Sequence, residues 1–187
     1  MLKILVVCTG NICRSPVAEQ LLRSQLDEKH YRVESAGTAA LVGHGLDSVS
    51  AKQMLRKTGL QPTVHIARQV SAELMDSADL ILTMTREQRT FLISELPAAM
   101  NKTYTLREFA RLATIIQSGI MNSDLNSKQV TFQKLKVARG QLLKVHDPIQ
   151  DDIIDPYGRS EEVAEWVISE VFAAVLVTAK FIRENFS

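Results

Sequence analysis

One stretch near the start of the chain constrains the fold more than any other. Residues 4–7, Ile-Leu-Val-Val, form a short apolar run without polar alternation, which is typical of a strand buried on both faces of a parallel sheet. The run leads directly into the segment Cys8-Thr9-Gly10-Asn11-Ile12-Cys13-Arg14-Ser15. Pro16 follows where a first helical turn would begin, with Ser15 as a candidate N-cap. This stretch therefore predicts a strand, a tight loop and a helix in immediate succession.

The rest of the chain alternates between strand and helix patterns. Further strands are predicted at 31–35, 78–84 and 103–106. Helices are predicted at 48–57, closed by Gly59, at 86–95, and from an N-cap at Ser160 toward the end of the chain. Such alternation favours an α/β fold with a parallel sheet. The length of 187 residues suits one domain, 1–187.

The segment between Leu106 and His146 carries two further helical patterns, and we interpret approximately 107–146 as a helical insertion within the domain. Its basic residues are Arg107, Arg111, Lys128, Lys134, Lys136, Arg139 and Lys144, opposed by Glu108 and Asp124. Two interpretations remain open: it docks an acidic partner such as a phosphorylated tail, or it is a solvated helical hairpin that packs Leu112, Ile116 and Leu142 onto the domain and binds nothing. The whole chain has a formal net charge of only +1, so we expect no nucleic-acid partner.

The spacing of Cys8 and Arg14 indicates phosphoryl-transfer chemistry. A thiol attacks phosphorus only as the thiolate, and a position between a buried strand and a helix N-terminus favours that anion. Five intervening residues let the backbone wrap around one phosphate, with Gly10 permitting close approach and unusual backbone angles. Arg14 offers a planar fork to two phosphate oxygens, and Ser15 can donate a hydrogen bond to the sulfur. These features predict a phosphatase with Cys8 as its nucleophile.

Cleavage of a phosphate ester also requires a proton for the leaving oxygen. The best candidate donor is Asp155, in Asp155-Pro156-Tyr157-Gly158, where Tyr157 offers an aromatic face to a substrate ring. Asp147, Asp151 and Asp152 are alternatives that spacing alone does not separate from it. We expect neither metal nor cofactor, because Arg14 and the loop amides carry the charge.

The two cysteines of the chain lie in the same loop. We therefore predict a reversible disulfide between Cys8 and Cys13 under oxidation. A secreted disulfide scaffold would need more cysteines. The apolar runs are too short for a signal peptide or a membrane span. These observations predict a cytoplasmic protein without membrane insertion, and we expect a monomer.

Several motifs, in a fixed order, resemble those of low-molecular-weight protein tyrosine phosphatases. They are Val6-Val7-Cys8-Thr9-Gly10-Asn11-Ile12-Cys13-Arg14-Ser15-Pro16, Ser35-Ala36-Gly37, His65-Ile66-Ala67-Arg68-Gln69, Ala78-Asp79-Leu80-Ile81-Leu82-Thr83-Met84 and Asp155-Pro156-Tyr157-Gly158. The resemblance covers about 1–106 and 147–187. It implies a flavodoxin-like four-stranded parallel sheet flanked by helices, with the site at the end of the first strand.

The resemblance also implies roles for individual residues. Cys8 would be the nucleophile, Arg14 the phosphate clamp, and Asp155, rather than Asp147, the acid and then the base. Asn11 would hold the loop through hydrogen bonds, with His65 in that network. The phosphate-binding loop would comprise Thr9, Gly10, Asn11, Ile12, Cys13 and Ser15.

The chain departs from the eukaryotic pattern at the pocket wall, where Thr38-Ala39-Ala40-Leu41-Val42-Gly43 follows Gly37. This stretch is similar to bacterial members linked to tyrosine autokinases and exopolysaccharide export, with Leu41 and Tyr157 on the wall. The expected substrate is a phosphotyrosine protein, such as a tyrosine autokinase. Two alternatives are an arsenate reductase of the same fold that uses an external thiol, and a non-catalytic phosphotyrosine-binding module.

Overall fold

A computed structural model describes residues 1–120, 128–142 and 147–186. Its sheet contains β1 (Leu2–Cys8), β2 (Tyr31–Gly37), β3 (Leu80–Thr83) and β4 (Thr103–Thr105). The strands are parallel and lie in the order β2-β1-β3-β4, so the predicted four-stranded parallel sheet is confirmed. The predicted strand at 78–84 is shorter than expected, because β3 begins at Leu80 and ends at Thr83.

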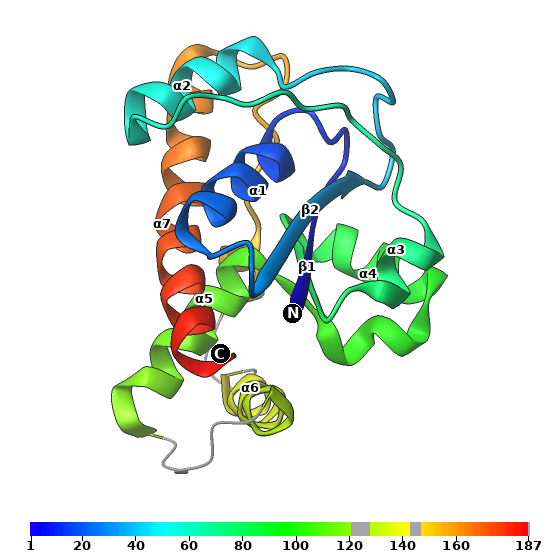
Figure 1. The fold of residues 1–187 in the computed structure, drawn as a ribbon, viewed down its shortest axis with the longest axis vertical. Helices are drawn as coiled ribbons and strands as arrows, with labels where there is room; N and C mark the ends of the chain where they lie inside the picture. Colours follow the sequence, from blue (N-terminus) through cyan, green and yellow to red (C-terminus); the bar gives the residue numbers. More distant parts are fainter. Residues whose placement is uncertain (121–127, 143–146, 187) are drawn as a thin grey trace.

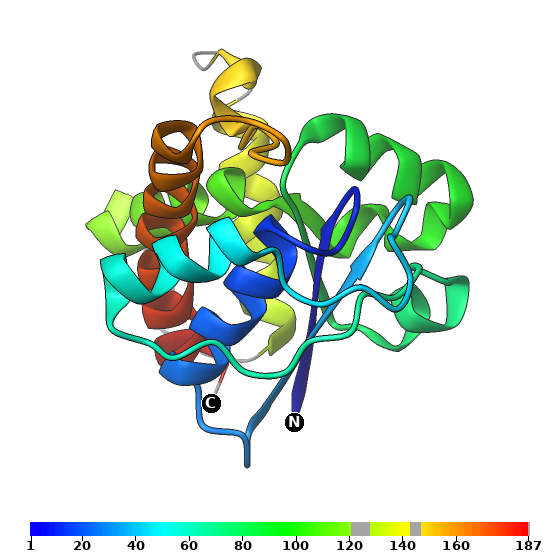
Figure 2. The same cartoon turned by 90° about the horizontal axis from the view of Figure 1, so that it is seen from above.

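Helices cover both faces of the sheet (Figure 1, Figure 2). One layer contains α1 (Arg14–Gln25), α2 (Ser48–Thr58), α5 (Leu106–Ile115) and α7 (Glu161–Asn185); α3 (Ala72–Ser77) and α4 (Arg86–Glu95) lie on the other side. Alternate β1 side chains face the two layers: Ile4 and Val6 join the larger core, and Leu5 and Val7 the smaller one. Burial on both sides explains why the β1 sequence lacks polar alternation.

Most helix ends lie where the sequence predicts them. Gly59 ends α2 in the left-handed conformation, at φ 73°, and the Ser160 hydroxyl accepts from the Val163 N–H at the start of α7. The expected Ser15 cap was wrong. Helix α1 begins at Arg14, and its N-cap residue, Cys13, makes no side-chain capping bond. The Ser15 hydroxyl instead faces Cys8, so this side chain serves the loop rather than the helix.

The region 107–146 is helical in its described parts. It contains most of α5, a π-helical turn at Ile116–Ile120, and α6 (Lys128–Leu142). Phe109 of α5 packs edge-to-face against Tyr104 and Phe181, and Leu135 of α6 belongs to the same core. Both helices therefore pack into the main core. Most of the polar run expected between them, and residues 143–146, lie outside the described residues.

Basic side chains on α5 and α6 form ion pairs within the described residues. Arg107 pairs with Glu170 at 2.8 Å, and Arg111 pairs with Asp151. Arg139 pairs with Glu108 at 2.7 Å and lies 3.9 Å from the centroid of the Tyr104 ring. These contacts favour the interpretation in which the segment packs onto the domain over the one in which it offers a free basic surface.

The short 3-10 helices at Pro97–Lys102 and Pro148–Asp151 complete the described elements. Among the helices of the described residues, none has the combination of length and apolar character that a membrane crossing needs.

Candidate active site

The loop between β1 and α1 places a hydroxyl and a backbone amide around the Cys8 sulfur. Ser15 Oγ lies 2.9 Å from Cys8 Sγ, and the Asn11 N–H donates to the same sulfur at 3.2 Å. Cys8 itself is buried. Because both neighbours are hydrogen-bond donors, this geometry would stabilise a negative charge on the sulfur.

Asn11 is the residue that gives the loop its shape. Among the described residues, it is the non-glycine residue with positive φ, at 54°, so the unusual backbone angle expected at Gly10 occurs one position later. An asparagine tolerates this conformation when its side chain is held. The Asn11 amide donates to Ser15 Oγ and to Ser35 Oγ, both at 2.9 Å, and the Asn11 Oδ1 accepts from the Arg68 N–H at 2.9 Å.

Two further residues support Asn11 from the segment after α2. His65 Nε2 lies 2.7 Å from the Asn11 carbonyl oxygen. Arg68 Nε donates to the Ser35 carbonyl at 2.9 Å, and Ser35 Oγ donates to Glu19 at 2.6 Å. The motif around Arg68 was recognised in the sequence, but the contributions of Arg68 and Glu19 were not foreseen.

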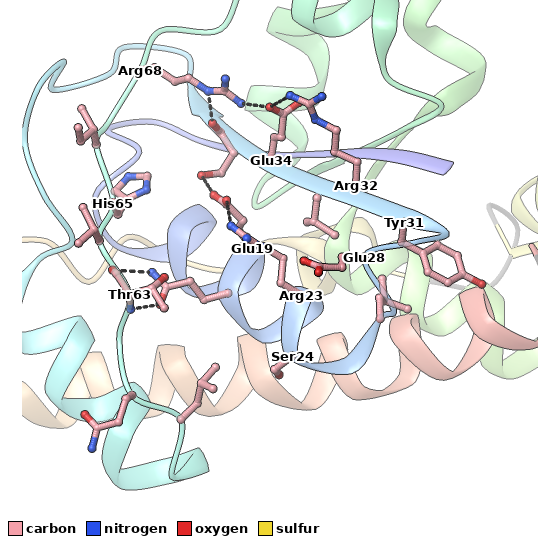
Figure 3. A pocket seen from close by; sticks show the side chains of 18 of the residues that line it. Glu19, Arg23, Ser24, Glu28, Tyr31, Arg32, Glu34, Thr63, His65 and Arg68 are labelled. Atoms are coloured by element: carbon pink, nitrogen blue, oxygen red, sulfur yellow. Dashed lines mark hydrogen bonds and ion pairs between the residues drawn. The ribbon is translucent and has the colours of Figure 1, made fainter. Parts of the chain in front are cut away.

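These supporting side chains line a hollow of about 1020 Å³ between α1, β2 and the segment 60–66 (Figure 3). The hollow contains neither Cys8 nor any residue of the acid loop, by which we mean residues 151–158. Several of its charged side chains are paired: Glu34 accepts from Arg32 at 3.0 Å and lies 3.5 Å from Arg68. We therefore assign the chemistry to a smaller cavity, which shares no lining residue with this hollow.

That smaller cavity has a volume of about 210 Å³. It is lined by Cys8, Thr9, Gly10, Ile12, Cys13, Arg14, Ala39, Leu41, Asp155 and Tyr157. The predicted nucleophile, phosphate clamp, acid and both predicted wall residues thus meet at one place. The cavity lining does not include Asn11, Ser15 or His65. These residues contact the phosphate loop or one another through the hydrogen bonds described above.

Leu41 reaches the cavity because the segment 38–41 runs alongside the phosphate loop and is hydrogen-bonded to it. The N–H groups of Thr38, Ala39 and Leu41 donate to the carbonyls of Cys8, Thr9 and Gly10 at 2.9, 3.0 and 3.0 Å. The close approach begins at Gly37, where an added Cβ would lie 2.3 Å from the Thr9 carbonyl oxygen. Glycine at position 37 is therefore required by space.

Arg14 joins the phosphate loop to the acid loop. Its side chain is only 2% exposed. One terminal nitrogen donates to the Ile153 carbonyl at 2.9 Å, and the other pairs with the Asp155 carboxylate. The Nε atom finds no acceptor among the described residues. A phosphate that enters the cavity would therefore meet a buried guanidinium with a donor still available.

The structure separates the four carboxylates that the sequence left ambiguous. Asp147 accepts from the Ile149 N–H and caps a 3-10 turn. Asp151 pairs with Arg111, and Asp152 pairs with Arg86 at 3.1 Å. Only Asp155 lines the cavity, where its side chain is 43% exposed and accepts from the Tyr157 N–H at 3.1 Å. This geometry favours Asp155 as the proton donor.

Helix α4 contributes a residue that sequence reasoning missed. Gln88 is buried and donates from Nε2 to Thr9 Oγ1 at 3.0 Å. Its Oε1 accepts from the Met84 and Thr85 N–H groups at 2.9 and 3.0 Å, which completes a capping box with Thr85. The capping pattern was readable in the sequence; the contact with Thr9, which lies 79 positions away, was not.

Cys13 differs from Cys8 in its surroundings. Its side chain is 3% exposed, and burial raises the pKa of the Cys13 thiol to about 12. Both cysteines are free thiols. Among the described residues, no three His, Cys, Asp or Glu side chains are grouped as metal ligands would be.

Comparison with known proteins agrees with this geometry. Residues 3–145 match the model of the family described as low molecular weight phosphotyrosine protein phosphatase. The low molecular weight protein-tyrosine-phosphatase Ptp of Acinetobacter johnsonii is 40% identical over 103 residues, which are 55% of this chain and 70% of that protein. A protein-arginine-phosphatase of Geobacillus stearothermophilus is 38% identical over 107 residues, 57% of this chain and 70% of that protein.

Solved structures extend the likeness to nearly the whole chain. The tyrosine phosphatase Wzb of Escherichia coli K30, in complex with sulphate, superposes with a TM-score of 0.69 at 28% identity. That match covers 96% of this chain and 98% of Wzb. The fold is thus that of known phosphatases.

Proposed function

Because this chain belongs to the low molecular weight phosphotyrosine protein phosphatase family, we propose that it hydrolyses phosphotyrosine in proteins through a phosphocysteine intermediate on Cys8. The observation that carries the proposal is the convergence of Cys8, Arg14 and Asp155 on one cavity of about 210 Å³. They come from β1, the start of α1 and the acid loop.

The first step transfers the phosphoryl group to the enzyme. The Cys8 thiolate attacks phosphorus and forms an S–P bond while the bond to the phenol oxygen breaks. Arg14 holds two of the phosphoryl oxygens, so the phosphate takes the place of Asp155 on the guanidinium. Asp155, as the carboxylic acid that the second step regenerates, then gives its proton to the departing phenol oxygen.

The second step releases phosphate. Asp155, now a carboxylate, takes a proton from water, and the water oxygen attacks phosphorus. The S–P bond breaks, and the thiolate of Cys8 leaves with the hydrogen bonds from Ser15 and the Asn11 N–H intact. Every proton and electron pair is accounted for by Cys8, Asp155 and water.

The residues of the cavity wall are suited to an aromatic substrate. Beyond the phosphate loop and Asp155, its lining consists of Ala39, Leu41 and Tyr157. Leu41 and Tyr157 offer apolar and aromatic surface to a flat ring. We expect a higher kcat/KM for a phosphotyrosine peptide than for matched phosphoserine and phosphoarginine peptides. A preference for the phosphoarginine peptide would instead indicate the substrate class named for the Geobacillus relative.

The physiological substrate is proposed to be a phosphorylated tyrosine autokinase in the cytoplasm, with the phosphatase acting as a monomer. This proposal rests on the resemblance at Leu41 to bacterial members of the family. Release of phosphate from a phosphorylated tyrosine-rich kinase tail would test the substrate, and the mass of the enzyme measured by light scattering would test the oligomeric state.

Substitution of the proposed nucleophile and acid tests the mechanism itself. Cys8→Ser should abolish turnover of p-nitrophenyl phosphate, and Asp155→Ala should slow it by roughly 10²–10⁴. Asp147→Ala is the matched control, because Asp147 caps a 3-10 turn and does not line the cavity. A large loss in Asp147→Ala together with full activity in Asp155→Ala would overturn the assignment of the acid.

A further inference from the structure

The acid loop is attached to the first turn of α4 through Asp152. This carboxylate accepts from the Arg86 backbone N–H at 2.8 Å. It also accepts from Arg86 Nε, with both carboxylate oxygens at 3.3 Å, and from a terminal nitrogen at 3.1 Å. The next residue of the loop, Ile153, donates its N–H to the Met84 carbonyl at 2.8 Å. Two successive residues of the acid loop are therefore fixed to the end of β3 and the start of α4.

The contact combines an ion pair with a hydrogen bond to the helix backbone. Arg86 is the first residue of α4, so its N–H is one of the donors that a helix leaves without an intrahelical partner. Asp152 satisfies that donor and places a negative charge at the positive end of the helix dipole. The side chains are 40% exposed for Arg86 and 25% for Asp152. The pair is thus held by backbone geometry as well as by charge.

The catalytic carboxylate itself has few anchors. Asp155 contacts Arg14 and the Tyr157 N–H, and the proposed reaction gives its place on Arg14 to the phosphoryl group. Once the substrate is bound, the position of Asp155 depends on the loop that precedes it. Asp152 is three residues upstream, and the Ile153 carbonyl accepts from Arg14 at 2.9 Å.

We propose that Arg86 is a positioning residue that sets the location of Asp155 by holding Asp152. Arg86 does not line the cavity, so its effect on the reaction passes through the acid loop. The inference rests on the proposed role of Asp155 as the acid that protonates the leaving phenol. It adds a residue on a different element, 66 positions from its partner in the sequence, to the parts that the reaction requires.

The readout is the dependence of kcat/KM on the leaving group. A phosphatase with a correctly placed acid is insensitive to whether the departing phenol is a strong or a weak acid, because the proton is supplied to it. Asp155→Ala should favour dinitrophenyl phosphate strongly over phenyl phosphate. Arg86→Met should show the same selectivity in weaker form, with a loss for phenyl phosphate of up to about 10²-fold, the cost of a misplacement of about 1 Å. Dinitrophenyl phosphate should lose little.

Further variants separate positioning from a general loss of structure. Asp152→Asn should reproduce the selectivity of Arg86→Met, and the double variant should be no more selective than either single one. Arg107→Met is the matched control, since it removes an ion pair with Glu170 that lies between α5 and α7. Inhibition by inorganic phosphate should be unchanged in all of them, because the phosphate loop is untouched.

The outcomes distinguish this inference from the proposed function. If Asp155→Ala is selective while Arg86→Met and Asp152→Asn are as insensitive as the parent enzyme, Arg86 does not position the acid and only this inference falls. If Asp155→Ala is itself insensitive to the leaving group, the assignment of the acid falls with it. Should Arg86→Met fold poorly, Asp152→Asn, which keeps the size of the side chain, decides the question by the same measurement.

Discussion

The hydroxyl oxygen of Ser15 lies 2.9 Å from the sulfur of Cys8 and accepts a hydrogen bond from the Asn11 side chain. Since the oxygen already accepts from Asn11, its proton is available to the sulfur, and the alternative acceptor, the Ala36 carbonyl, is more distant at 3.5 Å. Ser15 is therefore oriented as a donor toward the atom that must leave as a thiolate in the second step.

We expect Ser15→Ala to lower kcat about ten- to hundredfold, because a hydrogen bond to a charged group contributes roughly 1.5–3 kcal/mol. Hydrolysis of phosphocysteine should slow most, so a burst of p-nitrophenol should precede the steady state in stopped-flow traces. Ser24→Ala, which removes a hydroxyl bonded to the Leu21 carbonyl within α1, should leave kcat unchanged. An unaltered kcat in Ser15→Ala would refute the assigned donor.

A methyl group at position 37 should displace the phosphate loop. The added Cβ of Gly37→Ala would lie 2.3 Å from the Thr9 carbonyl oxygen, which is a backbone atom and cannot move without the loop. We expect loss of activity together with a lower midpoint of thermal unfolding. Gly140→Ala is the control: its Cβ meets nothing within 4 Å, and in a helix the change should stabilise by up to about 1 kcal/mol.

The raised pKa of Cys13 bears on the predicted disulfide. A thiol attacks an oxidised sulfur as the thiolate, and burial keeps Cys13 protonated up to a pKa of about 12. Closure onto an oxidised Cys8 should therefore be slow near neutral pH and accelerate as the pH rises. After peroxide, dimedone should trap the Cys8 sulfenic acid at neutral pH, and Cys13→Ser should lose the fraction of activity that dithiothreitol restores. Equal recovery in that variant would exclude Cys13 as the resolving thiol.

The same thiol predicts a pH dependence of stability. In the unfolded chain Cys13 ionises near its ordinary pKa of 9.0, but in the folded protein its pKa is about 12. Below pH 9.0 both states are protonated and the free energy of unfolding does not depend on this group. Above that, only the unfolded state ionises, so stability should fall by up to about 1.4 kcal/mol per pH unit. Urea unfolding of Cys13→Ala should lack this component; identical slopes in both proteins would contradict it.

The phosphate loop could be predicted from the sequence because its parts are contiguous. A buried strand, a glycine, an arginine and a proline within 13 residues fix one another's positions by local geometry. The same local patterns predicted Ser15 as the helix N-cap. This prediction was wrong, because the Ser15 hydroxyl contacts the Cys8 sulfur instead of capping the helix. The N-cap preference of a residue such as serine does not decide its role where its side chain is required in a functional site.

The acid loop shows what local patterns do not contain. Four aspartates lie between 147 and 155, and their roles depend on partners elsewhere in the chain. Asp151 is matched to Arg111 and Asp152 to Arg86, 40 and 66 positions away. The contact of Gln88 with Thr9 is of the same kind. Contacts between residues so far apart in the sequence depend on the order of the strands in the sheet. They cannot be predicted from local sequence patterns.

The unused donor of Arg14 has a consequence for how the enzyme responds to its surroundings. A buried guanidinium with Nε unpaired among the described residues favours any tetrahedral oxyanion that can complete its hydrogen bonds. Inorganic phosphate is such an anion, and each turnover releases one. The reaction therefore produces its own competitor, so the rate at which phosphotyrosine is removed should decline as phosphate accumulates. We expect inorganic phosphate to limit the activity in this way without any dedicated regulatory site.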